Sequence, residues 1–277
     1  MDIKHICTVY FSPTGNVKRI AEVLASRIIE KTGTGPAAVY DFTLPAGRKE
    51  DLIFGEGDLV IFGTPVYAGR VPNVLLPFLN EHIKGSGAIA IPFVSFGGRS
   101  YDNALTELFH LLAEHGFTVA GSCAVSSEHA FPDTIGAGHP DEADISRLCS
   151  FADGVLAAVT EAAAFSEIKA AEPEGIYPPP GYYRPLKADG TPAVFLKATS
   201  KADMSLCTRC MKCAAVCPMG SIDASEPDVM HGICIKCQAC IHVCPAGARY
   251  FDNPDFLSHQ EMLRQNYSST APSAYFI

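Results

Sequence analysis

A duplicated run of cysteines constrains the fold of this chain more than any other feature. Of its 11 cysteines, eight lie between residues 207 and 244. They form two copies of the pattern C-x2-C-x2-C-x3-C-P, at Cys207, Cys210, Cys213, Cys217, Cys234, Cys237, Cys240 and Cys244. The same offset of 27 residues relates Leu206 to Ile233 and Gly220 to Gly247. Two copies of one half-module predict a small unit with pseudo-two-fold symmetry over residues 201–250.

This spacing indicates ligation of iron–sulfur clusters. The N-terminus lacks the layout of a secretory signal, so crowded cysteines favour metal or cluster ligation over disulfides. Three thiolates at three-residue spacing can surround one face of a 4Fe–4S cluster, while the fourth, before proline, reaches the other cluster. The predicted first set is Cys207, Cys210, Cys213 and Cys244, and the second set is Cys217, Cys234, Cys237 and Cys240. Two four-cysteine zinc sites are the alternative, although paired C-x2-C knuckles would leave the middle cysteine of each run unused.

The first 165 residues alternate between strand and helix patterns. Short apolar stretches predict strands at residues 3–11, 39–42, 59–62, 88–94 and 118–125. Helical periodicity is found after residue 16 and at residues 72–82, 101–115 and 141–165. Five strands that alternate with helices predict a parallel sheet covered on both faces. Ligands of such sheets bind at the carboxyl ends of the strands, which points to loops 12–17, 63–71 and 95–103.

The rest of the chain divides by composition. Residues 166–200 contain the proline-rich stretch Ile-Tyr-Pro-Pro-Pro-Gly-Tyr-Tyr-Arg-Pro. Because proline restricts the backbone, we expect this segment to be a stiff linker. Its tyrosines, Tyr177, Tyr182 and Tyr183, are expected to pack on a domain surface. The cysteine module follows at residues 201–250, and we expect residues 251–277 to form a polar tail. Residues 1–165 would then form the first domain.

The loop after the first strand is suited to bind a phosphate. Its residues are Ser12, Pro13, Thr14, Gly15, Asn16 and Val17. Hydroxyl groups and the free amides at a helix N-terminus can hold a phosphate dianion without a basic side chain. The segment resembles the phosphate loop of flavodoxins, which holds the phosphate of FMN, except that Val17 replaces a hydroxyl-bearing residue. The alternative is a helix cap made by Ser12 or Thr14 with no ligand.

Two further loops occupy the positions at which flavodoxin-like folds hold the isoalloxazine ring. The candidate cofactor-binding residues there are Thr64, Pro65, Tyr67, Ala68, Gly69, Ser95, Phe96, Gly97, Gly98 and Tyr101. Because the chain has no Trp, ring stacking must come from Tyr67, Phe96 or Tyr101. Tyr67 can instead be an aromatic at the edge of the core, and Arg70 and Arg99 can pair with nearby carboxylates.

The cysteine module resembles the bacterial-type two-cluster ferredoxins, and the whole chain resembles the flavodoxin–ferredoxin fusion proteins, or EFR-family ferredoxins, of anaerobic bacteria and archaea. The resemblance implies an α/β fold: a flavodoxin-like, doubly wound, five-stranded parallel sheet with a small C-terminal two-cluster module. It also implies FMN and two 4Fe–4S clusters as cofactors, electron transfer as the function, and a redox protein as donor or acceptor.

Two other functions stay open at this point. One is a flavin-dependent reductase of a small molecule that uses the clusters as internal electron carriers. Its substrate site would include loop 126–140, with His129, Asp133 and His139. The other is a scaffold that has lost its flavin, for which Val17 is the support. No hydrolase motif such as H-E-x-x-H or a Walker sequence is present.

Charge and hydropathy exclude several partners. The net charge is -9, and residues 1–165 carry 11 Lys and Arg against 19 Asp and Glu. An acidic domain without a basic stripe argues against nucleic-acid or anionic-membrane binding. No stretch of about 20 residues is apolar throughout, so a cytoplasmic protein is expected.

Three cysteines lie outside the repeat: Cys7, Cys123 and Cys149. We expect each of them to be an inert thiol. The sequence leaves the oligomeric state open.

Overall fold

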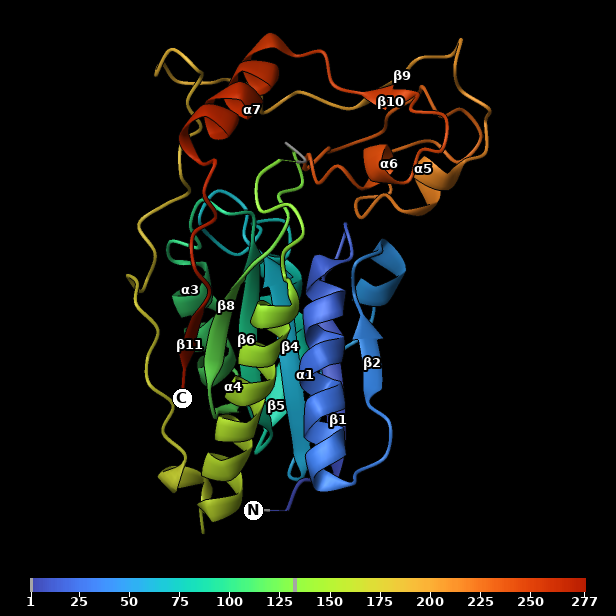
Figure 1. The fold of residues 1–277 in the computed structure, drawn as a ribbon. Coiled ribbons are helices and arrows are strands. Elements are labelled where there is room, and N and C mark those ends of the chain that lie inside the picture. The colour runs from blue at the N-terminus through green and yellow to red at the C-terminus, as the bar shows by residue number, and fades with distance from the viewer. Residues whose placement is uncertain (1, 132–133) are drawn as a thin grey trace.

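The computed structural model describes residues 2–131 and 134–277, and it contains a sheet domain below a smaller cysteine-rich module (Figure 1). The five main parallel strands are β1 (His5–Tyr10), β2 (Ala38–Asp41), β4 (Asp58–Pro65), β6 (Ile89–Phe96) and β8 (Ser122–Ser126). They lie in the order β2-β1-β4-β6-β8. Counted along the chain, this is the 2-1-3-4-5 order of the flavodoxin-like doubly wound fold. The predicted fold class is therefore confirmed.

The sheet also has elements that the sequence did not predict. The last expected strand is divided into β7 (Thr118–Val119) and β8, and both pair with β6. A short strand from the C-terminus, β11 (Ala274–Phe276), pairs antiparallel with β8 and extends the sheet by one edge strand. The helix α7 (Pro254–Asn266) precedes it. The expectation of a polar tail over residues 251–277 is therefore wrong.

Helices cover both faces of the sheet, as predicted. The helices α1 (Asn16–Thr32) and α4 (Glu142–Glu161) pack on one face, in one cluster of buried side chains. The helices α2 (Leu76–His82) and α3 (Ala104–Glu114) belong to the cluster on the other face. Helix α1 buries the side chains whose helical spacing predicted it: Val17, Ile20, Ala21, Leu24 and Ile28. A separate pair, β3 (Leu52–Gly55) and β5 (Ile83–Ser86), and two 3-10 turns, η1 (Pro45–Arg48) and η2 (Phe165–Glu167), complete this domain.

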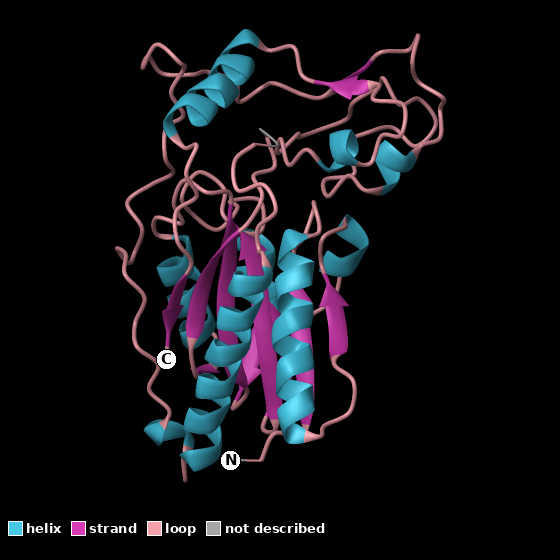
Figure 2. Cartoon of the chain, viewed as in Figure 1, coloured by secondary structure: helices cyan, strands magenta, loops and turns pink. Residues whose placement is uncertain are grey.

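The cysteine module lies over the carboxyl ends of the parallel strands (Figures 1 and 2). Its two short helices are α5 (Lys212–Ala215) and α6 (Ala239–His242), which repeat with the 27-residue offset of the sequence. The strands β9 (Lys201–Ala202) and β10 (Arg249–Tyr250) close it as an antiparallel pair. Among the described residues, two polar contacts join the module to the sheet domain. Arg48 donates to the carbonyl of Pro218 at 2.5 Å, and His242 donates to that of Ala130 at 3.2 Å.

The segment before the module is extended and lies along the sheet domain (Figure 2). The Tyr177 hydroxyl donates to the Glu114 carboxylate at 2.8 Å, and its ring stacks on His110 with 4.2 Å between centroids. The Tyr182 hydroxyl donates to the carbonyl of Val71 at 2.8 Å. The predicted packing of these tyrosines is confirmed. In the described part of the chain, no helix is both long and apolar enough to cross a membrane.

Candidate functional site

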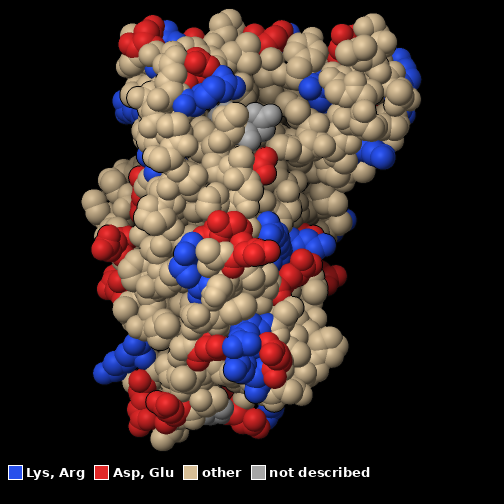
Figure 3. Space-filling model, in the orientation of Figure 1, with Lys and Arg blue, Asp and Glu red and all other residues tan. Residues whose placement is uncertain are grey.

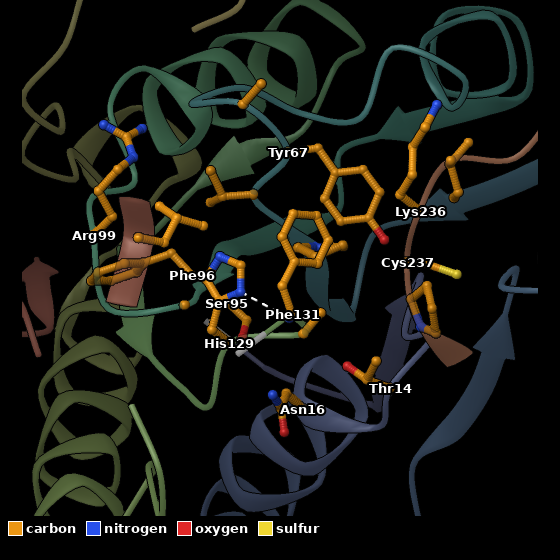
Figure 4. A pocket seen from close by; sticks show the side chains of 18 of the residues that line it. Thr14, Asn16, Tyr67, Ser95, Phe96, Arg99, His129, Phe131, Lys236 and Cys237 are labelled. Atoms are coloured by element: carbon orange, nitrogen blue, oxygen red, sulfur yellow. Dashed lines mark hydrogen bonds between the residues drawn. The ribbon is translucent and has the colours of Figure 1, made fainter. Parts of the chain in front are cut away.

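A cavity of about 250 Å³ lies where the strand ends meet the cysteine module (Figure 4). Because about 10–15 Å³ of such space is enough to hold one water molecule, this cavity has room for a ring system. Most candidate cofactor-binding residues line it, namely Ser12, Thr14, Asn16, Val17, Pro65, Tyr67, Ala68, Gly69, Ser95, Phe96 and Gly97. Four candidates, Gly15, Thr64, Gly98 and Tyr101, are not part of its lining. Three loops far apart in the sequence thus converge on one space.

The loop between β1 and α1 presents free amides to this cavity. Gly15 has φ 95, a left-handed conformation that glycine adopts without strain, and it turns the chain into the helix. The main-chain amides of Thr14, Gly15, Asn16 and Val17 have no hydrogen-bond partner among the described residues. The Ser12 hydroxyl accepts from the amide of Lys18 at 2.9 Å, so it caps the helix while its own hydrogen can still be donated. This arrangement fits an anion at the start of α1.

The second and third loops bring backbone close to their neighbours. Gly69 has φ 78, and a Cβ there would lie 2.3 Å from a carboxylate oxygen of Asp102. A Cβ on Gly97 would lie 2.4 Å from the ring of His129. Only glycine fits either position without moving these neighbours. The Tyr101 ring packs on Phe96 at 5.5 Å between centroids, outside the cavity.

Both arginines of these loops are paired with carboxylates, as the alternative interpretation predicted. Arg70 binds the buried Glu107 through two side-chain hydrogen bonds, one of them 3.1 Å long. Arg99 forms an ion pair with Asp102, and its guanidinium lies over the ring of Tyr183 at 4.4 Å. Arg99 nevertheless also lines the cavity.

Nearly a third of the lining residues come from segments that the sequence did not predict to take part. These residues are Tyr183, Pro185, Phe195, Ile235, Lys236, Cys237, His259 and Leu263. They belong to the linker, the cysteine module and α7. Of loop 126–140, His129 lines the cavity, whereas His139 binds Asp144 at 2.5 Å and Asp133 lies outside the described residues. No local pattern marks these positions, because only tertiary contacts bring them together.

Two neutral histidines, His129 and His259, line the cavity. Burial lowers the pKa of His129 to about 4, with smaller contributions from His259 and Arg99, and burial also lowers the pKa of His259. The amide of Phe131 donates to Nδ1 of His129 at 2.9 Å, which leaves the proton on Nε2. His259 Nδ1 bonds to the carbonyl of Leu186 at 2.8 Å and must carry the proton there. The assigned tautomers make His129 Nε2 a donor and His259 Nε2 an acceptor.

On the other side, Cys237 lines the same cavity. In Figure 4 the Tyr67 hydroxyl points toward the side where Cys237 and Lys236 lie, while Arg99 and His129 lie opposite and Thr14 and Asn16 below. Burial raises the pKa of Tyr67 well above its usual value, and Cys237 and Cys234 raise it further. Burial raises the pKa of Cys237 to about 12, and Cys240, Cys234 and Cys217 add to the effect. The members of the second cysteine set therefore lie within electrostatic reach of Cys237.

The two halves of the module repeat each other in backbone as well as in sequence. Arg209 and Met211 have φ 54 and 58, and their repeat mates Lys236 and Gln238 have φ 58 and 65. Such left-handed non-glycine residues are costly and persist only where something else compensates. The amides of Ser221 and Ala248, again repeat mates, donate to the sulfurs of Cys217 and Cys244, each at 3.3 Å. Strained loops that surround sulfur atoms fit the ligation of a cluster by each cysteine set.

A buried cation lies beside thiols of both sets. Arg249 is 4% exposed and donates to the carbonyls of Pro227 at 2.5 Å and Ser200 at 3.2 Å. Burial raises the pKa of Cys213 and of Cys240, while the charge of Arg249 opposes this rise at both. Its Nε is buried without a hydrogen-bond partner among the described residues. A positive charge with a free donor fits an anionic iron–sulfur group.

The three cysteines outside the repeat play no part in either site. Cys7 and Cys123 are buried, and Cys149 is half-buried. Burial raises the pKa of Cys7 to about 11, with Asp58 adding to the rise, so its thiol stays protonated at neutral pH.

Comparison with known proteins supports these assignments for the module. Residues 199–245, which include all eight repeated cysteines, match the 4Fe-4S dicluster domain family. A flavodoxin from the domain Archaea is similar in structure, with 18% identity, a TM-score of 0.40, and coverage of 55% of this chain and 97% of that one. The flavodoxin of Streptococcus pneumonia TIGR4 has 23% identity, a TM-score of 0.39 and coverage of 55% and 97%. An apo NADH:FMN oxidoreductase has 17% identity, a TM-score of 0.40 and coverage of 60% and 94%. The fold assignment itself rests on the strand order.

Proposed function

We propose that this chain, which joins a domain of flavodoxin strand order to a 4Fe-4S dicluster domain, is an electron-transfer protein that passes electrons between two 4Fe–4S clusters and FMN. One observation carries the proposal: Cys237, a ligand in the second cysteine set, lines the same cavity as the phosphate-type loop and the two ring-type loops. Clusters exchange single electrons and FMN exchanges one or two, which is the chemistry that the joined modules would supply.

The chain's own residues would hold FMN in this cavity. The free amides at the start of α1, with the hydroxyls of Ser12 and Thr14, provide one phosphate site. Tyr67 and Phe96 supply flat apolar surface for a ring, and His129 and His259 supply a donor and an acceptor. The lining offers one such cradle of amides, which favours a monophosphate over the diphosphate of FAD.

The proposal is tested by metal and flavin analysis of anaerobically purified protein. Two clusters require about 8 Fe per chain, in line with the duplicated ligand run. FMN should be released in equal amount to the chain, and the absorption spectrum should contain both flavin and cluster bands. Stoichiometric zinc with negligible iron after careful reconstitution would contradict the cluster assignment. Stoichiometric FAD, or no flavin after incubation with FMN, would contradict the flavin assignment.

The phosphate site can be tested by replacing Thr14 with alanine. Thr14→Ala should weaken FMN binding by about 1–3 kcal/mol, which is the contribution of one hydrogen bond to a charged group. The dissociation constant can be measured from flavin fluorescence in titrations of the apo-flavin protein. Thr34→Ala, just beyond the opposite end of α1, is the matched control, because Thr34 bonds to the hydroxyl of Thr32 outside the cavity. If both variants bound FMN with equal affinity, the Thr14 hydroxyl would not be a ligand of the phosphate.

A second candidate function is a flavin-dependent reductase of a small molecule. The observation in its favour is the polar wall formed by His129 and His259, which could orient a substrate carbonyl beside the ring. A reductase would oxidise its reduced flavin with a small acceptor, and His259→Phe would slow that step while FMN stays bound. An electron carrier would instead return its electrons only to a redox protein.

A further inference from the structure

The two halves of the cysteine module share their cysteine spacing but differ in their surroundings. Loop 206–212 and loop 233–239 are repeat mates with the same left-handed backbone positions. In the second loop Lys236, Cys237 and Gln238 are buried, at 9%, 8% and 4% exposure. In the first loop the equivalent Arg209 and Cys210 are exposed, and Met211 is half-buried. The two loops therefore differ in how far the rest of the chain covers them.

The second loop is covered by the rest of the same chain. Cys237 faces the cavity of the sheet domain, and Lys236 donates to the carbonyl of Leu196 in the linker at 2.5 Å. Nearby, His242 contacts the loop after β8. A partner protein therefore has no access to the second set from this side, whereas Cys210 of the first set lies at the surface.

The open loop also has a charge opposite to that of the molecule. Residues 204–217 contain Arg209 and Lys212 and no acidic residue, while the chain as a whole has a net charge of -9. Both cations are exposed, and neither forms an ion pair with any residue in the described ranges. Leu206, in the same loop, is 54% exposed. Blue atoms lie along the outer edge of this end of the molecule in Figure 3.

We propose that loop 206–212 is the docking surface for a small one-electron redox protein whose own iron–sulfur cluster is bordered by Asp and Glu. The proposal rests on the proposed function. In each encounter the partner's reduced cluster would lose one electron and a cluster held by the first cysteine set would gain it, with no bond made or broken and no proton moved. The second set, which lies beside the cavity, is then the inner carrier.

Electrostatics explains why the partner is acidic. Opposite charges around two docking patches speed up and orient association, and a like-charged body suppresses other orientations. An acidic partner is repelled by the acidic sheet domain and attracted to Arg209 and Lys212. The exposed Leu206 supplies the apolar centre that such an interface needs within a polar rim.

The test is the double charge reversal Arg209→Glu with Lys212→Glu in the full-length protein loaded with iron. The probe is an acidic bacterial 2Fe–2S ferredoxin, reduced beforehand. Electron transfer is followed by EPR of freeze-quenched samples, which distinguishes a reduced 2Fe–2S cluster from a reduced 4Fe–4S cluster. The second-order rate constant at low ionic strength should fall about tenfold or more, and the difference should shrink at high salt, where exposed charges are screened. Reduction by dithionite should not change.

The matched control is Lys31→Glu with Lys169→Glu, which alters the net charge equally. Both lysines are exposed, in the last turn of α1 and just after η2, at the end of the sheet domain far from the module (Figure 1). Equal rates for the loop variant and the unmodified protein, or an equal loss in the control, would overturn the proposal. Iron content and cluster reduction are recorded separately from flavin content, so absence of FMN would overturn the proposed function without affecting this result.

Discussion

Cys237→Ser should leave FMN bound but slow its reduction by a protein donor by at least about 100-fold, the loss expected when a positioned group is displaced. Cys237 is in the second cysteine set and lines the cavity, so its loss removes the carrier nearest to the proposed flavin. The phosphate-type loop lies on another element and should keep its ligand. A small chemical reductant should still reduce the flavin at the normal rate, because it needs neither a docking surface nor a relay.

The matched control for this variant is Cys149→Ser in α4, outside both cysteine sets. It should keep its full iron content and the rate of the unmodified protein. Flavin reduction is followed in stopped flow with each donor in turn, and iron is measured in the same samples. Unchanged reduction by the protein donor after loss of one cluster would show that the two modules are independent carriers in one chain.

Arg249→Met should destabilise the cysteine module by about 3 kcal/mol, because hydrogen bonds to charged groups contribute about 1.5–3 kcal/mol each and buried acceptors are left unpaired. Arg249 donates to Ser200 and to the carbonyl of Pro227, and its charge opposes the burial penalty on thiolates of both sets. Methionine has a similar length but neither the charge nor the donors. Release of iron to a chelator should then accelerate on the order of 100-fold.

Arg209→Met tests whether this effect depends on burial. Arg209 is also in the module, but it is exposed and forms no side-chain hydrogen bond with the described residues. Its replacement should change iron release by less than a few-fold, since surface substitutions usually stay within about 0.5 kcal/mol. Similar release from both variants would mean that the hydrogen bonds of Arg249 do not hold the module together.

The sequence by itself determined the features that depend on local spacing. The C-x2-C-x2-C-x3-C pattern places cysteine side chains on one tight loop whatever surrounds it, and the structure repeats its backbone at the same offset. The apolar positions Val17, Ile20, Leu24 and Ile28 define one face of α1 because a helix has 3.6 residues per turn. Alternation of strands and helices gave the parallel sheet, and the carboxyl-end rule gave the three loops that line the cavity.

The tertiary structure alone decided the rest. The strand β11 has only three residues, too few for a periodic signal, and it forms because its backbone pairs with the edge of β8. His259 enters the cavity wall from α7, more than 100 residues after His129, and no local rule links the two. Two loops with the same cysteine spacing become different because the sheet domain covers Cys237 and leaves Cys210 at the surface. Local spacing determines which atoms a loop presents, whereas packing between distant segments determines what those atoms face.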